Sequence, residues 1–431
     1  MSRITRIVIS RMGIVMRSTT KLVLLLTCSA FNAQEITLDD CYNLAKKNYP
    51  LVKQQELIIT SKEYTVQNAN RAYLPQVSIN GQATYQSAVT ALPIKLPGVT
   101  VPELSKDQYR IYGEVNQFLY DGGMTSAQKK IAESSANLET QKMEAELYKL
   151  RERINQIYFG ILLLDEQHKQ LSLLMSDLDA NLKRVDAAVQ NGAALKSNAQ
   201  VIQAELLKAK QRETELLASK KLYLDMLSLF TGTKYNETTK LQRPVLVTSS
   251  GSVHRPELSV LDLQASHLQL QTGMIRAKSL PKVSLFLQAG YGRPALNMLS
   301  NTFESYYIGG LRLNWSLTGL YTLKNEKSII EINKRNLEIQ KEIFVFNTGF
   351  NLSQQNSETT RLNELLKTDD EIVALRSSIS KSYSAQLENG VLNSADYLRE
   401  RNAEEQAREN KVLHEIQLLL AAYNLKTSYG D

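Results

Sequence analysis

Apolar and polar residues alternate in four short stretches of the chain. The apolar positions of the first stretch are Val77, Ile79, Gly81, Ala83 and Tyr85, and polar residues stand between them. A period of two is typical of a strand with one apolar and one polar face. The alternation predicts strands at about 76–86, 108–119, 282–292 and 305–317.

After each pair of strands the apolar residues have helical spacing. From Leu147 to Val189 they recur at alternating intervals of three and four residues, a pattern that predicts a coiled-coil seam. Residues 124–190 as one helix would be about 100 Å long. Asn191-Gly192 then predicts a reversal of the chain, because glycine allows the backbone conformation that ends a helix.

The same order of elements occurs twice. Leu74-Pro75-Gln76-Val77-Ser78 aligns with Leu280-Pro281-Lys282-Val283-Ser284 at an offset of 206 residues, and Asn191-Gly192 aligns with Asn389-Gly390 at an offset of 198. We predict a mainly α-helical protein with a small β part. It consists of two repeats of helix, strand, strand, long helix, turn and helix.

The repeats set the expected domain boundaries. Repeat 1 covers residues 35–232 and has its hairpin tip near 191–198. A connector follows at 233–254. Repeat 2 covers 255–431 and has its tip near 389–396.

Residues 1–34 have the layout of a secretory signal peptide. Five basic residues and no acidic one accompany the apolar run 22–26, which is too short to span a bilayer as a helix. Met12 and Met16 are alternative starts that keep this layout. Cys28 leaves attachment of a lipid open as an alternative to cleavage near Ala33-Gln34.

Charge and composition argue against several functions. The chain carries 51 basic and 44 acidic residues, and removal of residues 1–34 leaves 46 and 44, a formal charge of about +2. No dense basic stripe with interleaved aromatic residues remains, so nucleic acid is not an expected partner. Cys41 is then the single cysteine, which excludes an internal disulfide.

The sequence contains no recognisable catalytic constellation. The histidines at 168, 254, 267 and 414 lack metal-ligand spacing. His168 falls on the predicted seam and is interpreted as a packed residue. Glu404 and Glu405 are interpreted as solvated charges on a polar helix face. We therefore expect no enzyme activity, no cofactor and no metal site.

The predicted strands require more than one copy of the chain to assemble. Their length and their two-faced pattern fit strands of a transmembrane β-barrel. Open sheet edges in lipid cost several kcal/mol for each unsatisfied backbone group, so a spanning sheet must close. Four strands are too few to close around anything. Three copies of the chain would supply twelve.

The duplicated motifs resemble those of the TolC family of outer-membrane channel proteins. They are the two Leu-Pro strand entries, the exit Tyr120-Asp121-Gly122-Gly123 and the two helix-turn tips, and the resemblance covers essentially the whole chain after residue 34. It implies a homotrimer in the cell outer membrane, with a 12-stranded transmembrane β-barrel that continues as a trimeric α-barrel tunnel in the periplasm. It also implies docking to a periplasmic adaptor protein and an inner-membrane pump of RND or ABC type, for efflux or type I secretion.

The resemblance further implies candidate site residues. In the family, the glycine of each tip is followed six residues later by an acid that narrows the periplasmic aperture. Asp396 matches this position, whereas the first tip has Asn198 and a second family carboxylate falls on Arg399. Asp396 either lines the pore or stabilises a helix N-terminus, and Arg399 is expected to pair with it. The candidate adaptor-docking residues of the tips are Gly192, Ser197, Gly390 and Ser394.

Three other classes of protein fit the sequence less well than a channel does. A periplasmic adaptor also carries a coiled-coil hairpin, but normally only one. Neither an enzyme nor a purely structural coiled coil accounts for the amphipathic strands. The sequence leaves open whether the transported substrate is a drug, a metal or a protein.

Overall fold

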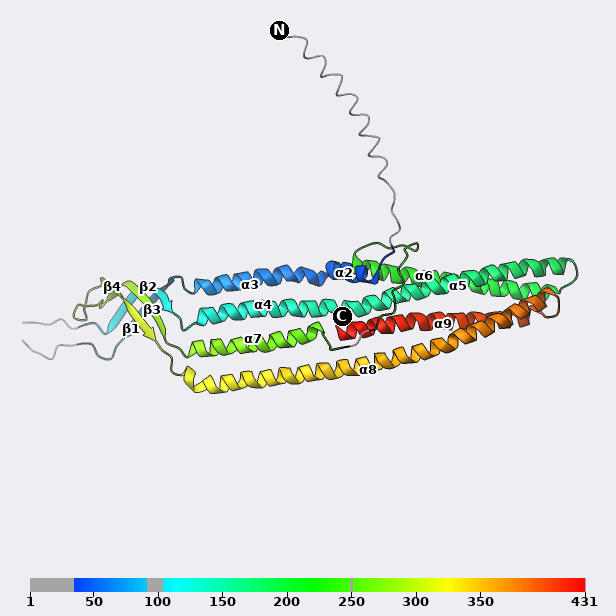
Figure 1. Ribbon diagram of the computed structural model, residues 1–431. Helices are drawn as coiled ribbons and strands as arrows, with labels where there is room; N and C mark the ends of the chain where they lie inside the picture. Colours follow the sequence, from blue (N-terminus) through cyan, green and yellow to red (C-terminus); the bar gives the residue numbers. More distant parts are fainter. Residues whose placement is uncertain (1–34, 91–103, 249–250, 431) are drawn as a thin grey trace, which may run out of the picture. The chain divides into compact units, whose positions relative to one another are not determined.

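The computed structural model describes residues 35–90, 104–248 and 251–430 (Figure 1). The predicted signal peptide at 1–34 lies outside the described residues. The chain divides into two compact units. Of the described residues, unit 1 contains 35–45, 153–246 and 361–420, and unit 2 contains 46–90, 104–152, 247–248, 251–360 and 421–430. Each unit is described by itself.

Unit 2 contains a four-stranded antiparallel sheet with the order β1-β2-β3-β4. The strands are β1 (Gln76–Tyr85), β2 (Asp107–Tyr120), β3 (Lys282–Arg293) and β4 (Glu304–Asn314). Each repeat supplies one hairpin. The pairing of β2 with β3, in which Val115 lies opposite Leu287, joins the two repeats in one sheet.

The register collects the apolar residues of all four strands on one face. Val77 pairs with Val115, Val115 with Leu287, and Leu287 with Gly309, so these residues form one row across the sheet. This face is largely uncovered in the single chain. Ile79 is 80% exposed and Tyr307 is 77% exposed.

The opposite face of the sheet is polar and carries a charged cluster. Glu114 on β2 accepts hydrogen bonds from Arg312 on β4 (2.7 Å) and from Gln288 on β3 (2.8 Å). The Arg312 guanidinium also lies 4.4 Å from the centre of the Phe286 ring. The two faces of the sheet therefore differ sharply in chemistry.

Helices adjoin the sheet in unit 2. Here α4 (Met124–Tyr148) packs against α3 (Gln54–Arg71) and α7 (Pro256–Lys278). Residues 319–360, the first part of α8 (Gly319–Glu388), belong to the same unit (Figure 1). The opening helix expected at 38–72 is divided by the short 3-10 helix Pro50–Lys53, with α2 (Leu38–Asn48) before it. The proline explains this division, because it forces an extended backbone on the preceding residue.

The junction between β2 and α4 is held by one buried side chain. Asp121 accepts hydrogen bonds from the Tyr73 hydroxyl (2.9 Å) and from the backbone N–H groups of Gly123 (2.9 Å) and Thr125 (2.7 Å). The carboxylate thus caps the first turn of α4, where backbone N–H groups have no helical partner. Burial alone would raise the pKa of Asp121, but these hydrogen bonds outweigh it and lower the pKa.

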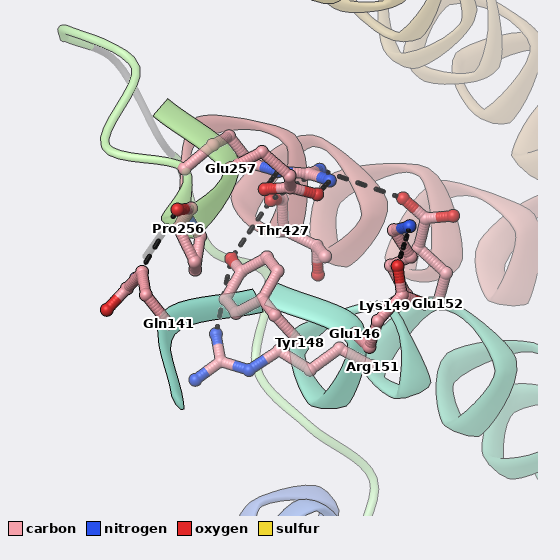
Figure 2. A network of polar contacts seen from close by, with 10 residues as sticks. Gln141, Glu146, Tyr148, Lys149, Arg151, Glu152, Pro256, Glu257 and Thr427 are labelled. Atoms are coloured by element: carbon pink, nitrogen blue, oxygen red, sulfur yellow. Dashed lines mark hydrogen bonds and ion pairs between the residues drawn. The ribbon is translucent and has the colours of Figure 1, made fainter. Parts of the chain in front are cut away.

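The long helix expected at 124–190 is interrupted at Lys149, where α4 ends and α5 (Leu150–Gln190) begins. A polar network surrounds the interruption (Figure 2). The Tyr148 hydroxyl donates to the carbonyl of Thr427 (3.0 Å), and Arg151 lies over the Tyr148 ring. Arg255 donates to Glu257 (2.6 Å) and to the same carbonyl (3.4 Å). The network ties the start of α7 to the C-terminal end of the chain.

Unit 1 contains α5, α6 (Lys196–Thr231), the end of α8 and α9 (Ser394–Tyr429). The predicted seam of α5 faces its core, since Ile154, Ile157 and Ile161 are at most 3% exposed. A continuous core joins α5, α6 and α9. Its buried residues are Leu171, Leu174, Leu178, Val185, Ala199, Ile202, Leu206, Ala209, Tyr397 and Leu398.

The segments that flank the helices are also tied into unit 1. Ile36 forms a bridge with Leu241, and the Tyr158 hydroxyl donates to the carbonyls of Ile36 and Gln242 at 2.7 Å each. Cys41 is fully buried, and burial raises the pKa of its thiol to about 12. The predicted fold class, mainly helical with a small sheet part and built from two repeats, is confirmed.

Candidate functional site: the helix tips and the charged clefts

Both helix hairpins of unit 1 reverse through the same backbone motif. At the first tip, the N–H of Ala193 donates to the carbonyl of Ala188 (2.8 Å) and that of Gly192 to the carbonyl of Val189 (3.1 Å). The second tip repeats both bonds around Gly390. This is a Schellman motif, which requires a left-handed residue after the helix. Gly192 and Gly390 both have φ of 71°.

The second tip has a side-chain cap. Asn393 precedes α9 and accepts a hydrogen bond from the backbone N–H of Asp396 (2.9 Å), while its amide donates to the Asp396 carboxylate (2.8 Å). The Asp396 carboxylate also accepts a hydrogen bond from Arg399 (3.1 Å), so the expected pair is present. Asp396 therefore lies in the first turn of α9, and its backbone N–H and its carboxylate both bond to the Asn393 side chain, which stabilises the helix start.

The first tip lacks this cap. Leu195 occupies the position before α6 and offers no side-chain hydrogen bond to the helix. The N–H of Asn198 donates instead to the Leu195 carbonyl (3.0 Å). Asn198 and Asp396 therefore occupy corresponding positions in different local networks.

The candidate docking residues differ in exposure. Gly192, Ser197 and Gly390 are exposed, and nothing lies within 4 Å of a Cβ placed on either glycine. Ser394, in contrast, is fully buried and its hydroxyl has no hydrogen-bond partner among the described residues. Gly192 and Ser197 are thus accessible at the first tip and Gly390 at the second, whereas the Ser394 side chain, at the start of α9, is not.

A charged cluster in α9 corrects the interpretation of Glu404 and Glu405 as solvated residues. Their exposures are only 6% and 5%. Arg401 bridges Glu404 (3.0 Å) and Asp177 of α5 (2.8 Å), and Arg408 also pairs with Glu404 (2.7 Å). The spacing of three and four residues between these charges was visible in the sequence. What the sequence could not reveal is that the face they occupy is buried against neighbouring helices.

Burial and ion pairing act in opposite directions on the two carboxylates. Burial alone would raise the pKa of Glu404, but hydrogen bonds from Arg408 and Ser380 and the charge of Arg401 outweigh it, so the pKa is lowered. Burial raises the pKa of Glu405, and the neighbouring Glu409 adds to the rise. Two adjacent acids of one helix thus have opposite titration behaviour.

The cluster forms one wall of an open cleft of about 660 Å³ between α5, α8 and α9. Asn181 of α5 extends it by accepting a hydrogen bond from Arg184 (2.8 Å) and donating to the Tyr397 hydroxyl (2.6 Å). Arg184 also pairs with Glu388 of α8. The polar side chains of this cleft therefore hold three helices of unit 1 together.

The histidines take part in local pairs. His414 lies 2.6 Å from Asp369 and His168 lies 3.4 Å from Glu213, with 37% of the His168 side chain exposed. Within the described residues, no group of three or more histidines, cysteines and acids is arranged to hold a metal ion. The same residues contain no helix that is both long enough and apolar enough to cross a membrane.

Comparison with known proteins finds a family model that matches part of the chain. The model of the family described as outer membrane efflux protein matches residues 41–233. A search among curated proteins found no match.

Solved outer-membrane channels share the fold over nearly the whole chain. The Campylobacter jejuni CmeC outer membrane channel is 14% identical with a TM-score of 0.62, over 91% of this chain and 85% of that one. The outer membrane protein VceC of Vibrio cholerae is 13% identical with a TM-score of 0.62, over 91% and 94%. The open state of the Neisseria gonorrhoeae MtrE channel is 14% identical with a TM-score of 0.64, over 91% and 88%.

At these identities the structural likeness concerns the fold, and the family match concerns the first repeat. Both findings agree with the resemblance to the TolC family read from the sequence, which is confirmed. The proteins matched are channels and not enzymes. The family model of outer membrane efflux proteins thus matches residues 41–233, less than half of the chain, and the chain shares the fold of solved outer-membrane channels.

Proposed function

We propose that this protein is the outer-membrane channel of a tripartite efflux or type I secretion system. It passes substrates from a periplasmic adaptor and an inner-membrane pump, of RND or ABC type, to the exterior. The observation that carries the proposal is the four-stranded sheet with one exposed apolar face, in a chain that shares the fold of solved channels. A periplasmic adaptor is less well supported, because the chain has two helix tips and membrane-length strands.

In this proposal, the sheet forms the part of the protein that spans the membrane. Three copies of the chain close twelve strands into a barrel, which removes the open edges of β1 and β4. The apolar face contacts lipid and the face with Glu114 and Arg312 lines the lumen. The alternation of apolar and polar residues in each strand fits this arrangement.

The helices give a second reason for assembly. In unit 2, α8 carries a row of exposed apolar side chains at intervals of three, four and seven residues. They are Ile329, Ile332, Ile339, Ile343, Phe346 and Phe350, each at least 53% exposed. A contiguous apolar surface of this kind marks an interface. We assign it to the neighbouring copy in the trimer.

In this proposal, the helix tips form the periplasmic end of the channel. Gly192, Ser197 and Gly390 form the surface that docks the adaptor, and Ser394 lies buried at the start of α9. Asp396, Arg399 and Asn198 lie at the periplasmic aperture, where three copies of Asp396 form a ring. Secretion through a signal peptide at 1–34 delivers the chain to the outer membrane.

Electrical recording tests the channel directly. The purified protein, added to a planar lipid bilayer under an applied voltage, should produce discrete conductance steps, and the heat-denatured protein should not. A membrane-inserted protein that gives no conductance at any voltage, with insertion verified by flotation, would refute the proposal.

Docking can be tested separately from channel formation. Gly192→Val and Gly390→Val each place a β-branched residue in a left-handed conformation at a cost of about 1–2 kcal/mol. Neither meets a neighbour, so assembly should be unaffected and binding to the adaptor should weaken. Gly273→Val is the matched control, because it adds the same side chain in open space within α7 without a positive φ. Equal adaptor binding by all three variants would exclude the tips.

A further inference from the structure

Glu405 differs from the other buried carboxylates of α9. It is 5% exposed, and its Oε1 has no hydrogen-bond partner among the described residues. Glu404 pairs with Arg408 (2.7 Å) and Glu409 pairs with Arg212 (2.6 Å). A buried carboxylate oxygen without a donor is costly, since it has lost its hydration and gained nothing in return. The position of Glu405 therefore calls for a partner.

Glu405 lines both the cleft described above and a second cleft of unit 1. This acidic cleft has a volume of about 430 Å³ and lies between α5, α6 and α9. Its size falls within the range of small-molecule sites. Leu171 and Leu174 from α5 and Ala209 from α6 provide an apolar wall, and each is at most 6% exposed.

The charged residues of the acidic cleft are not balanced. Its lining contains four carboxylates and two bases, an excess of two negative charges. The bases are already engaged, because Arg212 pairs with Glu409 (2.6 Å) and Lys208 lies 3.5 Å from Glu205. The charge excess and the unpartnered Oε1 of Glu405 both point to a positively charged donor.

We propose that the acidic cleft binds a small organic cation. Its ammonium or guanidinium group donates to Glu405, and its apolar part lies against Leu171 and Leu174. A charge-assisted hydrogen bond of this type is about twice as strong as a neutral one. The apolar wall selects ligands that also carry a hydrocarbon or aromatic group. This inference does not depend on the proposed channel function.

The titration of Glu405 agrees with the proposed site. Burial raises its pKa, Glu409 adds to the rise, and Arg401, Arg212 and Arg408 oppose it. The part of the cleft wall that α5 contributes is apolar. A bound cation favours the ionised carboxylate, so binding should release a proton and should weaken as the pH falls through the pKa of Glu405.

Benzylammonium is a suitable probe, because it combines a primary ammonium group with an apolar ring. Titration calorimetry of the full-length protein in detergent at about pH 7 should show saturable binding. Benzyl alcohol, which has the same shape without the charge, should bind at least about tenfold more weakly. The affinity for benzylammonium should fall as the pH is lowered from about 7 through the pKa of Glu405, which burial raises above the ordinary value of about 4.3.

Two substitutions separate the site from general electrostatics. Glu405→Gln keeps the shape of the side chain and should weaken benzylammonium binding by about tenfold or more. Glu364→Gln removes the same charge from an exposed position on α8, where the side chain is 66% exposed and pairs with Lys367. It should leave the affinity unchanged.

Three results would overturn the proposal. They are no saturable binding of benzylammonium by the wild type, equal binding of benzyl alcohol, and equal affinity in Glu405→Gln. If Glu405→Gln loses its helical circular dichroism signal, the pH dependence of benzylammonium affinity in the wild type tests the proposal instead. An affinity that stays the same from about pH 7 down to about pH 4, below the ordinary pKa of a glutamate, would then reject Glu405 as the partner of the cation.

Discussion

Asp121 is the residue on which the junction between sheet and helices in unit 2 depends. Its carboxylate accepts a hydrogen bond from the Tyr73 hydroxyl and from two backbone N–H groups at the start of α4. Because these bonds lower its pKa, the ionised carboxylate stabilises the fold. That contribution is complete above the unfolded pKa of about 3.9 and is lost as the pH falls through the folded pKa.

Asp121→Ala should therefore lower the free energy of unfolding by about 1–3 kcal/mol at neutral pH. The difference from the wild type should shrink as the pH falls below about 4 and through the lowered folded pKa, where the wild-type carboxylate becomes protonated in the folded protein as well. Denaturant unfolding followed by circular dichroism measures both effects. Thr318→Ala, at the exposed corresponding position of the second repeat, is the control and should change stability much less.

We predict that Asp396 influences the ion selectivity of the aperture. If its three copies line the pore, Asp396→Asn should lower cation preference, because clustered charges attract counter-ions. The asparagine keeps an oxygen for the helix cap. Arg399 pairs with Asp396 at 3.1 Å, so Arg399→Ala should shift selectivity in the opposite direction. The reversal potential in a salt gradient reports both changes, and a potential that neither variant moves would place the constriction elsewhere.

Single residues also mark the limit of prediction from the sequence. The position of Asp396 and its pairing with Arg399 follow from local spacing, which is why both could be anticipated. Glu404 and Glu405 could not be assigned correctly, because their burial depends on helices that are distant in the sequence. For the same reason the burial of Ser394 could not be predicted from its sequence position.

At the scale of elements, periodicity was a reliable guide where packing follows a repeating pattern. The alternation at 76–86 corresponds to β1, and the seam of α5 is buried at Ile154 and Ile157. The exact ends of the helices and the breaks within them depend on local features that the apolar periodicity does not reveal. Pro50 divides the first helix, and α4 ends at Tyr148 although the apolar spacing continues past it.

The two faces of β1 should differ in their surroundings in the assembled protein. Spin labels on Val77→Cys and Ile79→Cys should be accessible to oxygen dissolved in lipid, and labels on Ser78→Cys and Asn80→Cys to a water-soluble nickel complex. Cys41 is fully buried, so it should contribute little background. Equal accessibility at all four positions would contradict a membrane-spanning strand.

At the scale of the whole molecule, the single chain leaves two apolar surfaces without a partner. One is the face of the sheet that contains Ile79 and Tyr307, and the other is the α8 row that contains Ile332 and Phe350. The first suits lipid and the second suits another protein surface. The first follows from the alternation of residues in the strands, whereas the α8 row was not predicted. The need for more than one copy follows from the demand that the sheet must close, and the number three rests on the resemblance to the TolC family.

The mass of the assembled particle tests the central claim most directly. Native mass spectrometry of the full-length protein in mild detergent should give particles of three chains. Ile332→Asp, which places a charge in the α8 row, should reduce the trimer fraction, whereas Glu338→Gln on the same helix should not. A stable monomer that keeps its helical circular dichroism signal would contradict the account, because neither the sheet edges nor the α8 row would then need a second copy.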